Sequence, residues 1–530
     1  MTATLPATSV ERLLHESLLA RGSDPRFAHK TVVVIEGQPH TYAEMLDHAQ
    51  RLATALLVRG VTRGDRIAIY MDNSWPCVVS IFAILLAGGV FLLINPQTKS
   101  DKLRFILGDS GARLLLTDGH LAQEFTPLLD GTAATFNVIA SGNLPDGYPI
   151  VSFDTALADA APLATRPATI PLDLAALIYT SGSTGQPKGV MQTHQSMVFA
   201  SGSLIEYLRL GENDCILCAL PLAFDYGLYQ LLMTVRLGAT LVLERSFTYP
   251  AQVFARMVEF GVTVFPGVPT IFSMLLSAHR REPMCFPGIT RVTNTAAALA
   301  DNSATRLREI FPNALIYKMY GLTECKRVSF LEPELAERKP GSVGKAIPGT
   351  EVYLLSANGQ PTPTGKTGTL YVRGPHVMLG YWNQPEQSAD MLRPGKLPGE
   401  RVLCTQDQFR MDAEGFLYFV GRSDDIIKTR GEKVSPAEVE NAMLSIDGIR
   451  EVAVVGVADE LLDQSILAHV VLEQDCVLSA GQIRAQCIKR LENFMVPQQI
   501  VLCTELPHTA TGKVSKRALL QQTSSSRSGV

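Results

Sequence analysis

The stretch from Tyr179 to Val190 carries residues that are well suited to bind an anion. It reads Tyr-Thr-Ser-Gly-Ser-Thr-Gly-Gln-Pro-Lys-Gly-Val and follows an apolar run, Leu174 to Ile178, that is typical of a buried strand. Backbone amides, hydroxyls and a lysine in such a loop can converge on phosphate oxygens. A Walker loop is excluded, because Pro187 stands where its second Gly is needed and Gly189 follows Lys188. The sequence predicts a different phosphate-binding loop, and a flexible Gly/Ser linker is the alternative.

Three other stretches each end in a charged residue. Glu324 ends Tyr-Gly-Leu-Thr-Glu, Asp407 ends Thr-Gln-Asp, and Lys513 ends Pro-His-Thr-Ala-Thr-Gly-Lys. Carboxylate oxygens hold hard cations such as Mg²⁺, and a lysine can neutralise charge on a phosphoryl group. Read singly, Glu324 and Lys513 are better explained as ordinary solvated surface charges.

The composition limits the class of protein and its partners. A chain of 530 residues exceeds one hydrophobic core, so we expect two or more domains. With 47 Lys and Arg against 51 Asp and Glu, we expect neither nucleic acid nor a membrane surface as a partner. The nine scattered cysteines indicate reduced thiols and a cytoplasmic protein, and Cys215 and Cys218 fit a core strand better than a metal site.

One uncharged run, Cys77 to Ile94, reaches the length of a membrane span. Gly88-Gly89 interrupts it and Asn95-Pro96 follows it, so the sequence favours a buried helix, a turn and a short strand.

The order of elements predicts the fold class. Apolar strands such as Thr31 to Ile35 and Arg66 to Met71 alternate with helices, one of them capped by Thr41, which favours an α/β fold with layered, largely parallel sheets. We expect a large N-terminal domain of several subdomains with an added β region over residues 1–420, and a small, mobile α+β C-terminal domain over 421–523. Residues 524–530 are expected to form a disordered tail.

Together, these motifs resemble in type and order those of the adenylate-forming superfamily. That superfamily contains acyl- and aryl-CoA synthetases, the adenylation domains of nonribosomal peptide synthesis, and firefly luciferase. The resemblance runs from about Leu13 to Leu520. It implies an enzyme that uses ATP and Mg²⁺ to activate a carboxylic acid.

The resemblance implies a role for each motif. The first loop would embrace the β- and γ-phosphates of ATP, through Thr180, Ser181, Gly182, Ser183, Thr184, Gly185 and Lys188. Tyr320 belongs to the second nucleotide motif, in which Thr323 would meet the α-phosphate and Glu324 would hold Mg²⁺. Asp407 and Arg422 would bind the ribose, although Gln406 stands where the family usually has Gly.

The same resemblance assigns the C-terminal residues. Asp424 would be the hinge about which the small domain rotates, and Lys513 would be the catalytic lysine of the adenylation step. The loop from Gly431 to Pro436 would line the tunnel for the thiol, which is CoA or a phosphopantetheine arm. In the family, rotation about the hinge withdraws the lysine before the thioester forms.

The resemblance implies an acid site among four segments, Phe224 to Gln230, Phe265 to Thr270, Asn294 to Leu299 and Cys325 to Val328. The candidate residues in them are Phe224, Asp225, Tyr226, Tyr229 and Arg327. In amino-acid-activating relatives, an Asp at the position of Asp225 pairs with the substrate ammonium. A buried carboxylate needs a cation, which here is either that ammonium or a basic side chain at Lys326 or Arg327. The sequence leaves both alternatives open. The segment Asn294 to Leu299 departs from the family's usual adenine loop.

We therefore expect an AMP-forming acid–thiol ligase, which makes an acyl-adenylate and pyrophosphate and then a thioester on CoA or a carrier protein. The alternative is an amino-acid adenylating enzyme that loads a peptidyl carrier protein. A luciferase-like oxygenase and a nucleotide-binding protein without catalysis are more remote.

Overall fold

The computed structural model describes residues 11–129, 137–181, 187–295, 301–422, 425–429, 432–459, 462–474, 476–491, 493–509, 513–516 and 518–521. The chain divides into two compact units. The first contains Met1–Pro266, Thr323–Arg327 and Gly374–Leu392, and the second contains Gly267–Leu322, Val328–Arg373 and Arg393–Val530. The units differ from the domains predicted from the sequence, and the boundary at residue 420 stays a prediction.

The first unit contains a seven-stranded sheet in the order β7-β6-β5-β3-β4-β8-β9. Its strands are parallel except for the last pair, β8 and β9, which form an antiparallel hairpin. The bounds are β3 Arg66–Tyr70, β4 Val90–Ile94, β5 Leu114–Asp118, β6 Asn137–Ser141, β7 Ile150–Ser152, β8 Leu174–Ser181 and β9 Pro187–Thr193.

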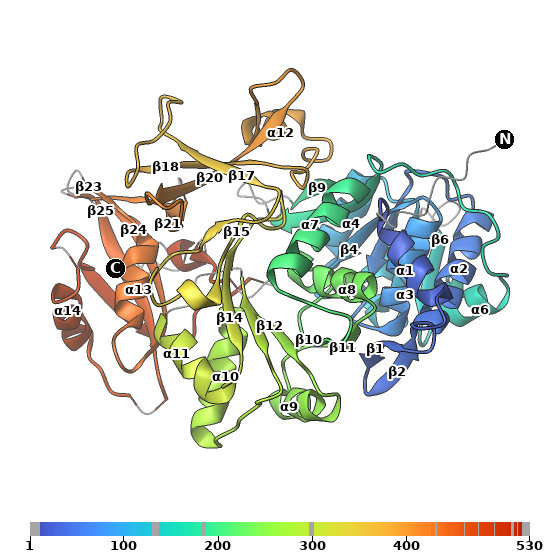
Figure 1. The fold of residues 1–530 in the computed structure, drawn as a ribbon, viewed down its shortest axis with the longest axis horizontal. Coiled ribbons are helices and arrows are strands. Elements are labelled where there is room, and N and C mark those ends of the chain that lie inside the picture. Colours follow the sequence, from blue (N-terminus) through green and yellow to red (C-terminus); the bar gives the residue numbers. More distant parts are fainter. Residues whose placement is uncertain are drawn as a thin grey trace. The chain divides into compact units, whose positions relative to one another are not determined.

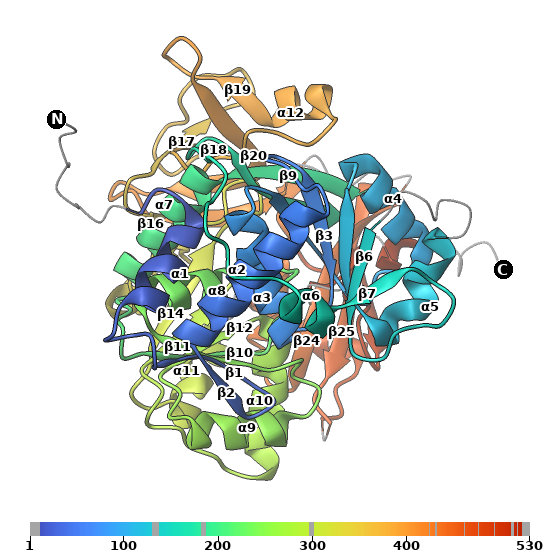
Figure 2. The same cartoon turned by 90° about the vertical axis from the view of Figure 1, so that its right-hand side faces the viewer.

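The uncharged run that follows β3 is a buried helix and a strand, as predicted. Helix α3, Trp75–Leu86, begins where the hydroxyl of Ser74 accepts the amide of Cys77 at 3.3 Å. It packs on β3 and β4. Helix α2, Tyr42–Val58, lies beside α3 (Figure 2) and begins at the predicted cap, since Thr41 Oγ1 accepts the amide of Glu44. None of the described helices is long and apolar enough to cross a membrane.

A second group of strands in this unit follows the order β12-β10-β11-β1-β2. Its β10 is the predicted core strand Cys215–Cys218, which is buried at every position. The other strands are β1 Thr31–Ile35, β2 Gln38–Thr41, β11 Thr240–Leu243 and β12 Val264–Gly267. The remaining helices of this unit are α1 Leu14–Ser23, α4 Ser100–Ser110, α5 Ala122–Phe125, α6 Phe153–Ala158, α7 His194–Tyr207, α8 Asp225–Leu237, α9 Pro250–Glu259 and α12 Pro385–Met391.

The second unit begins with helices and short strands and continues into an antiparallel β region. The first group comprises α10 Pro269–Arg281, β13 Arg291–Asn294, α11 Asp301–Ile310, β14 Leu315–Tyr320, β15 Ser329–Leu331 and β16 Lys345–Ala346. The β region comprises β17 Glu351–Leu355, β18 Thr367–Arg373, β20 Arg401–Met411 and β21 Leu417–Arg422, with β19 Leu392–Pro394 at one edge.

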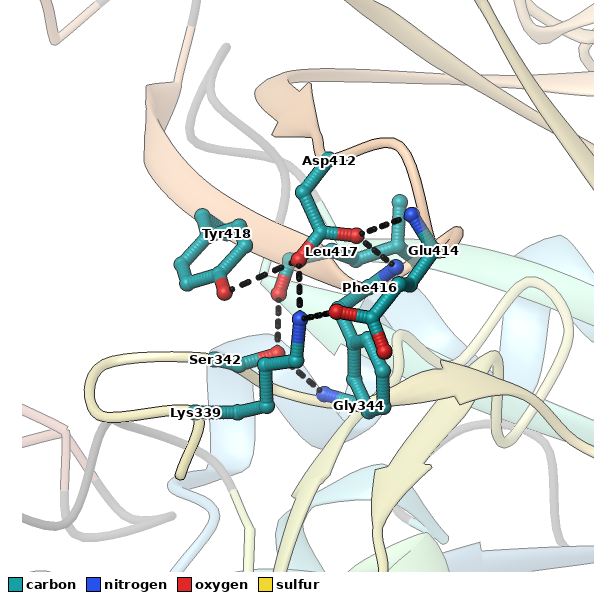
Figure 3. A network of polar contacts seen from close by, with 8 residues as sticks. All are labelled: Lys339, Ser342, Gly344, Asp412, Glu414, Phe416, Leu417 and Tyr418. Atoms are coloured by element: carbon teal, nitrogen blue, oxygen red, sulfur yellow. Dashed lines mark hydrogen bonds and ion pairs between the residues drawn. The ribbon is translucent and has the colours of Figure 1, made fainter. Parts of the chain in front are cut away.

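A charged network fixes the turn before β16 to the β20–β21 hairpin (Figure 3). Lys339 Nζ contacts Asp412 at 2.8 Å and Glu414 at 2.5 Å, and Ser342 Oγ donates to the carbonyl of Leu417 at 2.9 Å. The two carboxylates raise the pKa of Lys339. This network is structural and contains none of the predicted site residues.

The C-terminal part of the second unit is the small α+β element that the sequence predicts (Figure 1). Its sheet follows the order β23-β22-β25-β24, and β26 pairs in parallel with β25. The bounds are β22 Ile427–Thr429, β23 Glu432–Val434, α13 Pro436–Leu444, β24 Ile449–Asp459, β25 Asp463–Leu472, α14 Ala480–Ile488 and β26 Gln499–Cys503. Aliphatic residues such as Val439, Met443, Val454 and Ile466 give it a buried core of its own. The predicted tail, 524–530, lies outside the described residues.

Candidate active site

The cation that faces Asp225 is Lys326. Asp225 is the first residue of α8, and its Oδ2 lies 3.4 Å from Lys326 Nζ. Both residues are buried, with 9% of Asp225 and 5% of Lys326 exposed. Each charge therefore compensates the other in a place where neither could stand alone. The sequence left two kinds of partner open for Asp225, a substrate ammonium or a basic side chain. In this structure the partner is the basic side chain of Lys326.

Two buried tyrosines surround this ion pair. Lys326 Nζ lies 4.5 Å from the ring centre of Tyr229 and 5.4 Å from that of Tyr226. The guanidinium of Arg327 lies 5.7 Å from the Tyr226 ring, and the ring of Phe224 meets Tyr226 edge-on. We name Asp225, Tyr226, Tyr229, Lys326 and Arg327 the acid-side cluster. The structure thus brings together the five residues named for the acid site, and of the two basic partners considered for Asp225 it pairs Lys326 with it.

The electrostatics of Lys326 follow from this burial. Loss of solvent lowers the pKa of the Lys326 ammonium to about 8; the Asp225 charge opposes the change and Arg327 adds to it. Burial also raises the pKa of the Tyr229 hydroxyl, with a further contribution from the Asp225 charge. The tyrosine therefore stays neutral, and the pair of Lys326 and Asp225 holds the compensating charges.

The backbone at Lys326 is strained. Its φ is +60°, in the left-handed region that residues other than glycine rarely occupy, and the amide of Arg327 donates to the carbonyl of Cys325 at 2.6 Å. A hydrogen bond between residues two apart around a positive φ describes the uncommon form of the γ-turn. Such a residue costs roughly 1–3 kcal/mol and persists where its surroundings hold it.

The segment that carries Thr323 and Glu324 is held by the elements around it. The carbonyl of Thr323 accepts from Gln192 Nε2 at 3.0 Å, and the carbonyl of Glu324 accepts from the amide of Met378 at 2.8 Å. Gln192 lies in β9, directly after the predicted phosphate loop. The first unit therefore fixes this short segment through its backbone.

Tyr381 is a residue that the sequence motifs did not indicate. Its hydroxyl donates to Glu324 Oε1 at 2.7 Å, and Lys188 Nζ lies 5.2 Å from its ring centre. The same residue bridges Val190 in β9. Tyr381 thus touches both the predicted Mg²⁺ ligand and the predicted phosphate-binding lysine. It lies more than fifty residues beyond either motif, and no spacing in the sequence could have pointed to it.

The predicted phosphate loop joins β8 to β9. Thr180 pairs with Lys188 in this hairpin, so the described ends of the loop are antiparallel neighbours. Gly182, Ser183, Thr184 and Gly185 lie outside the described residues, as does the side chain of Ser181.

A second cluster of predicted residues lies wholly in the second unit. The hydroxyl of Tyr320 donates to Asp407 Oδ2, and Arg422 Nε lies 3.6 Å from the other oxygen of that carboxylate. The Tyr320 ring packs against Phe409 at 4.8 Å. We name Tyr320, Asp407 and Arg422 the ribose-side cluster, after their predicted role.

The departure at Gln406 has a conformational explanation. Gln406 has a φ of +60°, and the register between β18 and β20 shifts around it. The amide of Asp407 bonds to Thr405 Oγ1 at 3.1 Å within this irregular turn. The position therefore favours glycine, and Gln406 occupies the same left-handed conformation at some cost.

Lys513 lies on an exposed turn of the C-terminal part. The amide of Thr509 donates to the carbonyl of Lys513 at 2.7 Å, and the amide of Lys513 donates to Thr509 Oγ1 at 3.2 Å. Its side chain is exposed. The predicted hinge, Asp424, lies outside the described residues, and the roles of both residues stay predictions.

A separate cavity of about 370 Å³ in the first unit contains none of these residues. It is lined by Lys30, Thr31, Val34, Pro39, Asn213, Asp214, Cys215, Thr240, Phe260 and Gly261. The acid-side cluster in the first unit and the ribose-side cluster in the second, each described by itself, contain the candidate residues, and this cavity does not.

Comparison with known proteins identifies the family of the chain. The model of the AMP-binding enzyme family matches residues 22–382, and that of the AMP-binding enzyme C-terminal domain matches residues 438–513. Gramicidin S synthase 2 of Brevibacillus brevis is 30% identical over 92% of the chain, which spans only 10% of that synthase. The 2-succinylbenzoate–CoA ligase of Geobacillus kaustophilus is 31% identical, with 90% of this chain and 92% of the ligase covered.

A solved structure agrees with these relatives. The o-succinylbenzoate CoA synthetase of Bacillus subtilis, in complex with its acyl-adenylate intermediate, is similar with a TM-score of 0.81 and 29% identity. The comparison covers 95% of this chain and 97% of that one. The predicted family, the predicted two-domain α/β fold and the predicted class of AMP-forming ligase are confirmed. The chain belongs to the AMP-binding enzyme family, the adenylate-forming ligases.

Proposed function

We propose that this chain joins a carboxylic acid to a thiol at the expense of ATP, with an acyl-adenylate as the intermediate. The observation that carries the proposal is the position of Tyr381, which contacts Glu324 and lies beside Lys188. An oxygen ligand for a hard cation and a lysine for phosphate oxygens are thus held by one residue of the first unit. A ligand for a divalent cation and a basic side chain for phosphate oxygens are the groups that nucleophilic attack on a nucleoside triphosphate requires.

In the first half-reaction, a carboxylate oxygen of the acid attacks the α-phosphorus of ATP, and the bond to the bridging oxygen of pyrophosphate breaks. Negative charge accumulates on the phosphoryl oxygens, and donors and cations placed there lower the barrier. Lys188 and Lys513 would supply charge, and Thr323 a hydroxyl. Glu324 fits Mg²⁺, because it offers carboxylate oxygens, one of which Tyr381 already orients. The bound Mg²⁺ would add positive charge at the phosphates.

The ribose-side cluster would hold the sugar of the nucleotide. Asp407 is buried and bound by Tyr320, so its carboxylate keeps one orientation and can accept from sugar hydroxyls. Arg422 is about half exposed and can donate to the same sugar. Fixing the ribose in this way positions the α-phosphorus for in-line attack.

In the second half-reaction, a thiol sulfur attacks the acyl carbon and AMP leaves with one oxygen of the original carboxylate. The adenylate is a mixed anhydride, so water has to be kept out until the thiol arrives. Rotation about Asp424 would withdraw Lys513 and present the 431–436 loop to the thiol. We propose CoA or a phosphopantetheine arm as the acceptor. We also propose a cytoplasmic location, because the nine cysteines, all in the described part of the chain, form no disulfide.

Asp225 and the resemblance to gramicidin S synthase 2 support a second candidate, an amino-acid adenylating enzyme that loads a carrier protein. The contact between Asp225 and Lys326 favours the first candidate, since the carboxylate already has a cation.

Exchange of labelled pyrophosphate into ATP tests the proposal. We expect exchange that depends on Mg²⁺ and on one class of carboxylic acid, and formation of AMP and a thioester when CoA or a carrier protein is added. Nucleotide binding with no exchange from a broad panel of acids, amino acids included, would instead support a binding protein without catalysis.

A further inference from the structure

We propose that Lys326 determines the class of acid that this enzyme activates: its ammonium occupies the place beside Asp225, so the site takes acids without an amino group next to the carboxylate. The inference rests on the proposed function and deepens it. It concerns one side chain, which would act as a built-in substitute for the ammonium of an amino acid.

The contacts of Lys326 carry the first step. Its Nζ lies 3.4 Å from Asp225 Oδ2, and the side chains of Lys326 and Asp225 are 4% and 11% exposed. A second cation beside the same carboxylate would find its charge already compensated. Burying an uncompensated charge costs several kcal/mol. A substrate ammonium at this point would therefore be strongly disfavoured.

Arg327 adds to this effect. It is 1% exposed, and its charge contributes to the lowered pKa of the neighbouring Lys326. The acid-side cluster therefore contains two buried basic side chains on consecutive residues, beside the carboxylate of Asp225. An ammonium would meet repulsion from both basic side chains, whereas an uncharged acyl chain would not.

The backbone carries the second step. The γ-turn at Lys326, with its positive φ, fixes the direction in which the side chain leaves the chain. The rings of Tyr226 and Tyr229 then hold the ammonium from the side, at 5.4 and 4.5 Å. A lysine so held cannot withdraw its long side chain to make room for a substrate amine. The strain of the turn is what this placement costs.

A different use of Lys326 would be to bind a second carboxylate of a dicarboxylic acid. The observations favour the first use, because the ammonium is engaged by Asp225 and by two rings. The second use becomes an outcome of the experiment.

The experiment measures pyrophosphate exchange with matched pairs of acids that differ by one aliphatic ammonium group: hexanoate with 2-aminohexanoate, and 3-phenylpropanoate with phenylalanine. A series of dicarboxylates is included. For the wild type we expect kcat/KM for the best plain acid to exceed that of its amino partner by at least ~100-fold, since one uncompensated charge is worth more than the 1.4 kcal/mol that changes a rate tenfold.

Two variants locate the effect. In Lys326→Met the chain length is kept and the charge is lost, so Asp225 becomes free to accept an ammonium. We expect kcat/KM for amino acids to rise at least tenfold. The double variant Lys326→Met with Asp225→Asn removes both charges, should fold without an unpaired buried group, and should lose that gain while keeping the plain acids. Lys339→Met removes another lysine held by carboxylates, in the network of Figure 3, and should leave the acid preference unchanged.

The possible results separate the two claims. No exchange with any acid would overturn the proposed function and this inference together. Exchange with plain and amino acids at equal rates, or an active Lys326→Met with unchanged preference, would overturn only the inference. A selective loss of dicarboxylates in Lys326→Met would also overturn it and assign Lys326 to a substrate carboxylate. If Lys326→Met does not fold, Lys326→Gln, which removes the charge and keeps a hydrogen-bond donor for Asp225, decides: a preference as strict as that of the wild type contradicts the inference.

Discussion

Two lysines in different parts of the molecule illustrate two uses of the same charge. Lys326 lies on a strained turn and is paired with Asp225, and its burial lowers its pKa to about 8. Lys513 lies on an exposed turn of the C-terminal part, and no carboxylate pairs with it among the described residues. A cation that selects a substrate has to be fixed and compensated. A cation that works on a phosphate has to remain available for it.

The comparison also separates two kinds of motif. Lys513 ends a motif that can be read from the sequence, because the residues of that motif are neighbours in the chain. The role proposed for Lys326 depends on its contact with Asp225, which lies 101 positions away in the chain. The predictions below test the two halves of this comparison, from the largest expected effect to the smallest.

Replacement of Lys513 by alanine should have the largest effect. We expect pyrophosphate exchange to fall by ~10³-fold, as on removal of a donor to a transition-state charge, and thioester formation from supplied adenylate to change by less than ~10-fold. Lys516→Ala is the matched control, since Lys516 is a neighbouring lysine already paired with Glu440 at 2.8 Å, and should lose less than ~3-fold. If Lys513→Ala slowed both half-reactions equally, that result would contradict a role for Lys513 in the adenylation step alone.

Replacement of Glu324 by glutamine should have the next largest effect. The amide keeps the shape and loses the charge that a divalent cation needs, so we expect a loss of ~10²-fold in exchange and a higher Mg²⁺ concentration at half-maximal rate. Titration of the rate with Mg²⁺ measures both. An unchanged Mg²⁺ dependence would remove Glu324 from the metal site.

Replacement of Asp407 by asparagine should weaken ATP binding. A hydrogen bond to a charged group is worth ~1.5–3 kcal/mol, so we expect KM for ATP to rise ~10- to 100-fold with a smaller change in kcat. Tyr320→Phe, which removes the hydroxyl that orients Asp407, should raise KM by less. The ratio of the KM values of Asp407→Asn and the wild type is also measured with 2′-deoxy-ATP. If this ratio is as large as it is with ATP, Asp407 does not bind the 2′-hydroxyl of the ribose.

Replacement of Tyr381 by phenylalanine should lower the rate of pyrophosphate exchange moderately. The loss of one hydrogen bond to Glu324 corresponds to ~1 kcal/mol, or about fivefold in rate, and should appear mainly as a raised Mg²⁺ requirement. The double variant with Glu324→Gln should be no worse than Glu324→Gln alone. Additive losses would show that Tyr381 acts independently of Glu324.

The smallest effect concerns stability against acid. Burial lowers the pKa of His194 and of His376 to about 4, and burial together with His194 lowers that of His15 to about 3. The unfolded chain binds protons near pH 6.5, so stability is fully present above that pH and falls towards pH 4, by up to ~1.4 kcal/mol per pH unit for each histidine.

Unfolding midpoints between pH 7 and 5 measure this slope. His15→Gln should flatten it, and an unchanged slope would show that His15 titrates normally in the folded protein.

Much of the fold follows from local patterns in the chain. The capping Thr41, the interrupted apolar run of α3 and β4, and the core strand β10 were all predictable, because burial and capping act through neighbouring residues. The partner of Asp225 was not, because Lys326 and Arg327 are adjacent and only the γ-turn decides which of them faces the carboxylate. Tyr381 could not be found for the same reason: its contacts depend on tertiary packing and not on spacing.

The central claim, that a carboxylate oxygen attacks the α-phosphorus, has a direct test. The acid that gives the fastest exchange is labelled with ¹⁸O in both carboxylate oxygens and incubated with ATP, Mg²⁺ and the thiol acceptor, and the products are analysed by mass spectrometry. The account predicts AMP that contains one ¹⁸O for each thioester formed. The label in inorganic phosphate together with ADP, or a thioester formed with unlabelled AMP, would contradict it.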